Sequence, residues 1–124
     1  MIVVNNLSRH FHRLKAVDEL SFTIKPGEIV GFLGPNGAGK STTMKMLTGF
    51  LEPTSGSIEI NGQNMPGEAK ALQEIIGYLP EGAPLYGDMT VFQFLCFIAG
   101  VRGLKGKRRK ARLQNVIEQV ELHD

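Results

Sequence analysis

The feature that most constrains this chain is the glycine-rich octapeptide Gly34-Pro35-Asn36-Gly37-Ala38-Gly39-Lys40-Ser41. The apolar run Glu28–Leu33 precedes it, and Lys40–Phe50 follows it with helical spacing. This order predicts a strand buried on both faces, then a loop, then a helix. Glycines let backbone N–H groups converge on an anion, and the positive end of the helix dipole favours an anion at the same place. The octapeptide therefore predicts a phosphate-binding loop.

The spacing of Gly, four residues and Gly-Lys-Ser is the P-loop pattern of nucleotide-binding proteins. Lys40 is expected to bring a mobile charge to the β- and γ-phosphates. Ser41 is expected to place its hydroxyl on Mg²⁺, a hard cation that prefers oxygen ligands, and Thr42 to hydrogen-bond the α-phosphate. The nucleotide-binding residues predicted from the loop are Asn36, Gly37, Ala38, Gly39, Lys40, Ser41 and Thr42.

Hydrophobic periodicity and turn residues predict the remaining elements. Strands are expected at Ile2–Leu7, Leu20–Lys25, Ser57–Ile60 and Ile75–Leu79, and helices at Lys40–Phe50 (with Met44, Leu47 and Thr48 facing the core), at Glu68–Glu74, from Thr90 onward and at Lys107–Val120. Asn61-Gly62 predicts a hairpin turn, and Thr90 with Gln93 predicts a capping box. The fold class expected is α/β, with a mixed body over residues 1–87 and the beginning of a helical subdomain over 88–124.

Composition excludes several classes of protein. A hydrophobic content of 42% and a charged content of 21% argue against wholesale disorder. The single cysteine, Cys96, cannot form an internal disulfide, and Met1–Leu7 lacks the basic region of a secretory signal. The apolar run Val91–Val101 is about half the length of a membrane-spanning helix. It therefore predicts core of the helical part, with membrane insertion as the alternative, and we expect a soluble or peripheral protein.

The charge is unevenly distributed, although the net charge of +2 alone does not indicate a nucleic-acid-binding protein. Seven of the fourteen Lys and Arg residues fall within Arg102–Arg112. A solvated helix face is the ordinary interpretation of such a cluster. Contact with anionic lipid head groups or with nucleic acid are the alternatives.

With its surroundings included, the octapeptide resembles the N-terminal half of an ATP-binding cassette (ABC) ATPase. The residues that carry the resemblance are Pro26–Leu33 leading into Gly34–Thr42, then Leu47-Thr48-Gly49, Gly56-Ser57-Ile58 and Ile76–Pro80, in the family's order. The resemblance covers essentially the whole chain. It implies a partial P-loop NTPase core with an N-terminal antiparallel β portion and the start of a helical subdomain.

The family also implies roles for residues outside the loop. Phe11 matches the aromatic residue that stacks on adenine, with a core aromatic as the alternative, and Val17 is expected near the ribose. Glu81 stands where the family has a glutamine that contacts magnesium and senses the membrane partner. A carboxylate can keep the magnesium role, or Glu81 can be a loop residue facing water. Lys40 and Glu81 are thus the catalytic candidates, and Ser41 and Glu81 are the metal candidates.

The resemblance implies Mg-ATP as cofactor and a role as the motor ATPase subunit of an ABC transporter. Its partners are then a transmembrane permease and a second ATP-binding domain in a dimer, with no nucleic acid expected. The location is cytoplasmic, peripheral on the inner face of the cell membrane. Tyr78–Glu81 and Asp88–Val91 resemble exporters more than importers. A non-transport ABC protein acting on ribosomes or DNA is the alternative, and another P-loop enzyme such as a GTPase is a third hypothesis.

The family's signature motif, Walker B aspartate, catalytic glutamate and switch histidine are expected beyond Asp124. The 124 residues are therefore expected to bind ATP without hydrolysing it. A neighbouring strand for Glu28–Leu33 is also expected from that later part of the family's fold. Without it an apolar edge is exposed, which predicts self-association.

Overall fold

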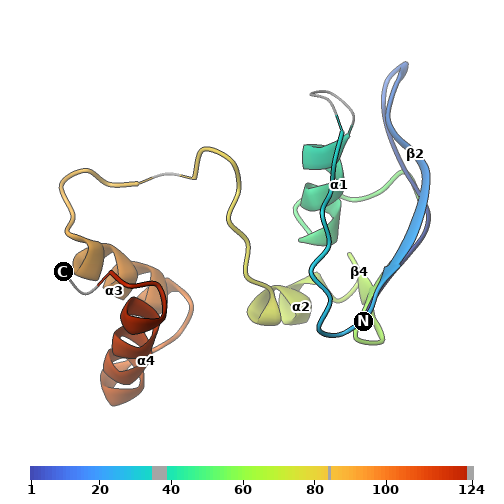
Figure 1. Ribbon diagram of the computed structural model, residues 1–124. Coiled ribbons are helices and arrows are strands. Elements are labelled where there is room, and N and C mark those ends of the chain that lie inside the picture. The colour runs from blue at the N-terminus through green and yellow to red at the C-terminus, as the bar shows by residue number, and fades with distance from the viewer. Residues whose placement is uncertain (35–38, 84, 123–124) are drawn as a thin grey trace. The chain divides into compact units, whose positions relative to one another are not determined.

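The computed structural model describes residues 1–34, 39–83 and 85–122. They form two compact units, Met1–Tyr78 and Leu79–Asp124 (Figure 1). The division falls earlier than the boundary expected after residue 87, within the segment that leads to the helices. The assignment of these parts as domains stays a prediction.

The first unit is built on an antiparallel sheet of four strands in the order β2-β1-β3-β4. Its strands are β1 (Ile2–Phe11), β2 (Leu14–Ile24), β3 (Ser55–Ile60) and β4 (Gln63–Met65). β1 pairs with β2 on one side and with β3 on the other. Three of the five expected strands, Ile2–Leu7, Leu20–Lys25 and Ser57–Ile60, are confirmed, and β1 and β2 are longer than expected. β4 was not expected, because three residues are too few for a period to show.

Two glycines explain how β3 reaches its neighbours. Asn61 and Gly62 have φ values of 49° and 81° between β3 and β4, the left-handed pair that a tight hairpin turn requires, so the predicted turn is confirmed. Gly56 has a φ of 88°, and a Cβ atom there would lie 2.2 Å from the carbonyl oxygen of Asn6. Only glycine therefore lets β3 approach β1 at this point.

Two helices complete the first unit, α1 (Lys40–Leu47) and α2 (Ala69–Ile75). Apolar side chains from both helices and the sheet share one core. Its buried members are Val4, Leu7, Val17, Met46, Ile58, Ile60, Met65 and Leu72. The Nε2 of Gln73 on α2 donates to the carbonyl oxygen of Thr48, just after α1, at 3.0 Å. The two helices are therefore joined by a polar contact at the edge of that core.

The inward face of α1 differs from the one expected. Thr48 is buried and Leu47 is partly buried, but Met44 is exposed. Thr43 and Met46 are the buried residues within the helix. Met46 packs in the core under the sheet, which turns Met44 outward. The apolar spacing gave the right helix but the wrong phase, because the buried face includes a threonine that hydropathy does not mark.

Two expected strands are absent from the described residues. Glu28–Leu33 and residues 76–79 have no strand assignment, and Ile29 and Leu33 are 102% and 95% exposed. The backbone N–H of Glu28 donates to the carbonyl oxygen of Lys25 at 3.2 Å, which closes a turn only. Apolar composition marks a segment suited to a buried strand, but a strand forms only where neighbours accept and donate its backbone hydrogen bonds. No described segment supplies those neighbours, so both predictions were wrong for this structure.

The second unit contains α3 (Val91–Val101) and α4 (Gly106–Gln119). The predicted capping box is confirmed, since the N–H of Gln93 donates to Thr90 Oγ1 at 3.1 Å and the N–H of Thr90 donates to Gln93 Oε1 at 2.9 Å. Ala99 and Leu113 are buried in the second unit. Over the described residues, every helix is too short or too polar to cross a bilayer.

Candidate nucleotide-binding site

The predicted phosphate-binding loop ends at the first residue of α1. The structure describes Gly34 before the loop and Gly39 after it. Pro35, Asn36, Gly37 and Ala38 lie outside the described residues, so the binding roles predicted for Asn36, Gly37 and Ala38 stay predictions. The described part shows what holds the end of the loop in place.

Gly39 is the N-cap of α1 and lies directly against β2. Its φ of 89° and ψ of 9° are left-handed. A Cβ atom on Gly39 would lie 2.3 Å from the carbonyl oxygen of Ala16 and 3.1 Å from Cγ2 of Val17. Both the conformation and the close approach therefore require glycine. The backbone passes from the loop into α1 so close to β2 that residue 39 has no room for a side chain.

Thr43 fixes the carbonyl group of Gly39. Its backbone N–H donates to the Gly39 oxygen at 2.9 Å, and its Oγ1 donates to the same oxygen at 2.8 Å. Thr43 is 1% exposed, so these bonds are shielded from water. Sequence reasoning missed this residue. Its position four residues after Gly39, one helical turn on, is the signal that could have found it.

The N-terminus of α1 is electrostatically suited to an anion. All residues of α1 are described, and its first turn contains no acidic side chain to compete for the positive end of the helix dipole. Nζ of Lys40 donates to the carbonyl oxygen of Gly34, so this side chain folds back across the ends of the loop. Ser41 is exposed and Thr42 partly exposed. Lys40, Ser41 and Thr42 are therefore the first three residues of α1, at its N-terminal end.

A pocket of about 390 Å³ lies between β2 and the start of α1. Its apolar lining includes Val17, Leu20 and Phe32, and its polar lining includes Lys40 and Thr43. The Phe32 ring packs edge-to-face on Phe22 of β2, with centroids 5.9 Å apart. Val17, predicted to lie near the ribose, is thus a core residue that also forms the wall next to Lys40.

Phe11 ends β1 and pairs with Leu14 across the β1–β2 hairpin. The residue is 39% exposed, so the core alternative is wrong. The guanidinium carbon of Arg9 lies 4.7 Å from the ring centroid, which gives a cation–π contact on one face. Stacking of adenine on the ring stays a prediction and would use the opposite face.

Glu81 is an exposed turn residue of the second unit. Its predicted role on magnesium stays a prediction. Among the described residues, no three His, Cys, Asp or Glu side chains gather into a metal-binding group. Ser41 would offer one hydroxyl oxygen as a ligand. Magnesium at this place would therefore take most of its ligands from nucleotide phosphates and water, as a P-loop cation does.

The sequence matches the model of a known protein family. The family model described as ABC transporter matches residues 17–124. The chain belongs to the ABC transporter family. Among curated ABC relatives, it is 40% identical over 118 residues to a probable multidrug ABC transporter ATP-binding protein, YbhF, of Escherichia coli strain K12, covering 95% of the chain and 20% of the relative. It is 38% identical over 124 residues to an uncharacterized ABC transporter ATP-binding protein, YxlF, of Bacillus subtilis strain 168, covering 100% of the chain and 40% of the relative.

A third relative is the Nod factor export ATP-binding protein I of Burkholderia pseudomallei strain 1710b. It is 41% identical over 106 residues, which are 86% of the chain and 35% of that protein. The ABC chain thus spans between a fifth and two fifths of the length of these relatives.

Solved structures agree on the fold. A structure titled as the ATP-binding subunit of an ABC transporter has a TM-score of 0.78 and 31% identity, with 95% of this chain and 49% of that one covered. A dimeric ATP-binding cassette bound to ADP and Pi has a TM-score of 0.81 at 21% identity, over 98% of this chain and 57% of that one. The ABC chain therefore has part of a P-loop ATPase cassette fold.

Proposed function

We propose that the protein binds Mg-ATP at the loop before α1 and acts as the motor subunit of an ABC exporter. The observation that carries this proposal is the placement of Gly39 against the Ala16 carbonyl. That contact sets Lys40 and Ser41 at the positive end of α1, where a nucleotide phosphate is favoured.

Each binding residue has one role in this proposal. Lys40 pairs with the β- and γ-phosphates, Ser41 ligates magnesium and Thr42 bonds the α-phosphate. Phe11 stacks on adenine and Val17 lies by the ribose. Bound magnesium would neutralise phosphate charge. The chain's own contribution is the fixed N-terminus of α1 and the shielded bonds from Thr43 that hold it.

The partners proposed are a transmembrane permease and a second ATP-binding domain, with the protein on the cytoplasmic face of the membrane. A dimeric cassette among the structural neighbours supports the pairing. Export is supported by the names of two relatives, a probable multidrug ABC transporter ATP-binding protein and a Nod factor export ATP-binding protein. The substrate of this protein is a separate question from its nucleotide site.

Equilibrium binding of a fluorescent ATP analogue to the 124-residue chain tests the nucleotide site. We expect magnesium-dependent binding that ATP displaces. Lys40→Ala removes charge-assisted hydrogen bonds, which contribute about 1.5–3 kcal/mol each, so affinity should fall roughly 10- to 100-fold. Lys45→Ala is the matched control, because Lys45 is an exposed cation in the last turn of the same helix.

Three outcomes would contradict parts of the proposal. Equal weak binding by the wild type and both variants would show that the motif does not form a site in this chain. Equal displacement by GTP and ATP would favour another P-loop enzyme. Phosphate release at a steady rate by the purified chain would refute the proposal that these 124 residues bind ATP without hydrolysing it.

A further inference from the structure

The Phe11 ring has a cation packed against one of its faces. Phe11 and Arg9 are two positions apart on β1, so their side chains project from the same face of that strand. The guanidinium carbon of Arg9 lies 4.7 Å from the ring centroid. Within the described part of the chain, Arg9 forms no ion pair with a carboxylate, so no anion competes with the ring for this charge. The contact therefore depends on residues of the first unit only.

The guanidinium of Arg9 is anchored to the segment that leads into β3. Its Nη1 donates to the carbonyl oxygen of Glu52 at 2.7 Å. That segment is itself bonded to β1, since the N–H of Thr54 donates to the Ser8 oxygen at 2.8 Å and the N–H of His10 donates to Thr54 Oγ1 at 3.0 Å. Nε of Arg9 is buried and has no hydrogen-bond partner among the described residues. The guanidinium is therefore held between a fixed carbonyl oxygen and the ring, and not by a network of hydrogen bonds.

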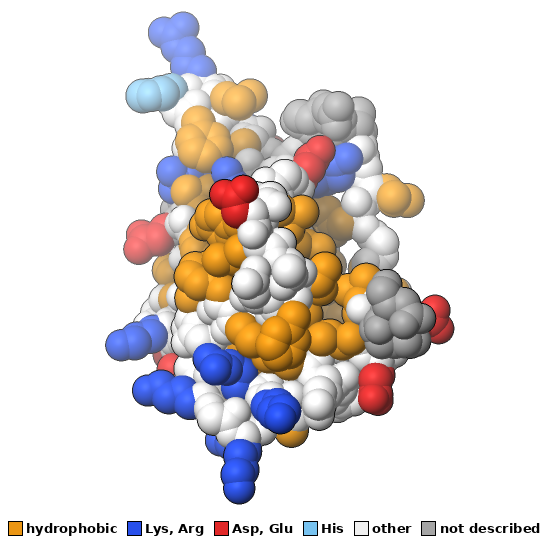
Figure 2. All heavy atoms as spheres, turned by 90° about the vertical axis from the view of Figure 1, so that its left-hand side faces the viewer, with side chains coloured by type: hydrophobic (Ala, Val, Ile, Leu, Met, Phe, Trp, Pro, Cys, Tyr) orange, Lys and Arg blue, Asp and Glu red, His pale blue; other side chains and the backbone are white. Residues whose placement is uncertain are grey.

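The pairing of β1 with β2 places this contact beside the phosphate-binding end of α1. Arg9 is opposite Val17 in that pairing, and opposed residues share a face of the sheet. Val17 in turn lines the pocket that contains Lys40, and its Cγ2 would lie 3.1 Å from a Cβ atom on Gly39. In Figure 2 the end of the β1–β2 hairpin is again uppermost, and hydrophobic side chains stand there beside Lys or Arg side chains. The ring and the start of α1 therefore belong to one region of the first unit.

We propose that Arg9 is a positioning residue for adenine, which holds the Phe11 ring by one face and leaves the other face free for the base. This role rests on the proposed Mg-ATP site, because the ring needs positioning only where adenine stacks on it. Two physical effects act in the same direction. A ring that is already fixed loses less freedom when the base arrives. A cation over one face also draws π-electron density toward itself, so the opposite face is less negative and repels the π-face of a base less.

Displacement of a fluorescent ATP analogue from the 124-residue chain by two competitors tests this role. The competitors are ATP and inorganic triphosphate, of which only ATP carries the base. Arg9→Gln removes the cation and keeps an amide donor for the Glu52 carbonyl. An exposed cation–π contact changes an equilibrium constant about two- to fivefold, so affinity for ATP should fall by that factor while affinity for triphosphate stays nearly constant. Equal losses of affinity for both competitors would show a general effect of charge and would overturn the proposal.

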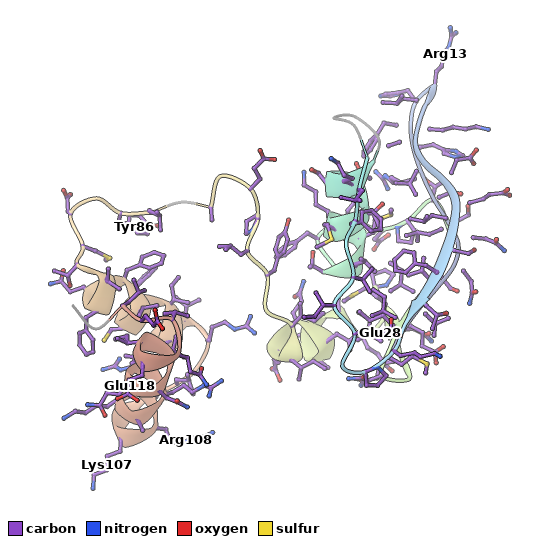
Figure 3. The ribbon with its side chains drawn as sticks, viewed as in Figure 1. Arg13, Glu28, Tyr86, Lys107, Arg108 and Glu118 are labelled. Carbon is purple, nitrogen blue, oxygen red and sulfur yellow. The ribbon has the colours of Figure 1, made fainter. Side chains whose placement is uncertain are left out.

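Two further variants control for the charge and for the contact. Arg13→Gln removes the same charge from the tip of the hairpin, where Figure 3 shows the Arg13 side chain extending away from the strands. It should change the affinities for ATP and for triphosphate alike, and only slightly. Arg9→Lys keeps a cation but lacks the planar group, so it should recover part of the affinity for ATP. Denaturant unfolding checks that each variant remains folded.

A double-mutant cycle distinguishes positioning of the ring from a general effect on the structure. If Arg9 acts through the ring, Arg9→Gln should cause no further loss of ATP affinity in a chain that already carries Phe11→Ala. Equal losses in both backgrounds would overturn the proposal. NMR gives a second test that needs no nucleotide, because the ring shifts the protons of a side chain held over it upfield. Arg9 side-chain protons with the same shift in the wild type and in Phe11→Ala would show that the contact does not form in solution.

Three outcomes separate the role of Arg9 from the proposed ATP site. If Phe11→Ala weakens ATP binding and Arg9→Gln does not, adenine stacks on the ring and Arg9 does not position it. If Phe11→Ala leaves ATP binding unchanged, the adenine contact is wrong and the role of Arg9 falls with it. Absence of ATP binding by the wild-type chain would reject the nucleotide site as a whole.

Discussion

The carbonyl oxygen of Ala16 lies so close to Gly39 that it would collide with any side chain there: a Cβ atom added to Gly39 would lie 2.3 Å from it. The end of the phosphate-binding loop is thus built against β2, a strand that belongs to a different part of the sequence. Because Thr43 holds the Gly39 carbonyl from the other side, the backbone is fixed between a strand and a helix.

Gly39→Ala should lower both stability and nucleotide affinity. The left-handed conformation costs about 1–3 kcal/mol for a residue with a side chain, and the contact with Ala16 forces a further shift. Gly27→Ala is the control, since Gly27 has a φ of 80° but nothing within 4 Å of the added carbon. Denaturant unfolding and analogue binding measure the two effects. Equal losses in both variants would mean that strain alone matters and that the Ala16 contact does not.

Gly56→Ala should destabilise the sheet by more than Gly62→Ala. Both glycines have left-handed φ, 88° and 81°, but only at Gly56 does the added carbon meet backbone, 2.2 Å from the Asn6 oxygen. The variant must therefore separate β3 from β1. We expect a loss of about 1–3 kcal/mol from strain at either site and a larger total at Gly56. Equal midpoints of denaturant unfolding for the two variants would contradict the close approach.

Phe11→Ala should weaken ATP analogue binding about 5- to 100-fold, because stacking on a base contributes about 1–3 kcal/mol. Phe11→Tyr keeps the ring and should preserve affinity. Leu14→Ala, on the residue that pairs with Phe11, controls for damage to the hairpin. The measurement is displacement of the fluorescent analogue by ATP and by inorganic triphosphate. If Phe11→Ala weakened both competitors alike, the ring would not contact adenine.

Thr90→Ala should unravel the first turn of α3. It removes one of the two capping-box bonds, and loss of such a cap costs about 0.5–2 kcal/mol. Thr90→Ser keeps the hydroxyl and should behave as wild type. Hydrogen exchange of the amides at residues 91–94 is the measurement, and only Thr90→Ala should accelerate it. Unchanged exchange would show that tertiary contacts, not the cap, hold this end of the helix.

Ile29→Lys should reduce self-association of the chain. Ile29 is fully exposed in an apolar segment that no described strand pairs with. Sedimentation velocity should show oligomers for the wild type and a shift toward monomer for the variant. Leu14→Lys places the same charge on an exposed leucine outside this segment and should have less effect. A wild-type chain that sediments as one monomeric species and melts cooperatively would refute the prediction.

Local signals in the sequence predicted local structure well. The Asn61-Gly62 turn and the Thr90–Gln93 capping box depend on neighbouring residues only, and both formed as expected. The P-loop pattern likewise placed Lys40 at the start of a helix. Its nucleotide contacts, and the whole of residues 35–38, stay predictions.

What the sequence could not predict depends on partners distant in the chain. The run Glu28–Leu33 has strand composition, but pairing requires neighbours that composition does not identify. The contact of Gly39 with Ala16 joins two segments that share no pattern. Thr43 was overlooked because a buried threonine is invisible to hydrophobic periodicity, and the same omission misplaced Met44.

The hydrogen bond from Gln73 to the carbonyl of Thr48 has a mechanical consequence. α1 is a rigid body about 12 Å long, with the phosphate-binding end at Gly39 and the Thr48 carbonyl at the other end. A tilt imposed at Gly39 by an arriving anion would therefore displace α2 through Gln73. The chain after α2 leaves in an extended conformation at Ile76 and leads toward the helical unit. We therefore expect binding at the loop to be felt at α2, through the Gln73 bond and through the core that both helices share.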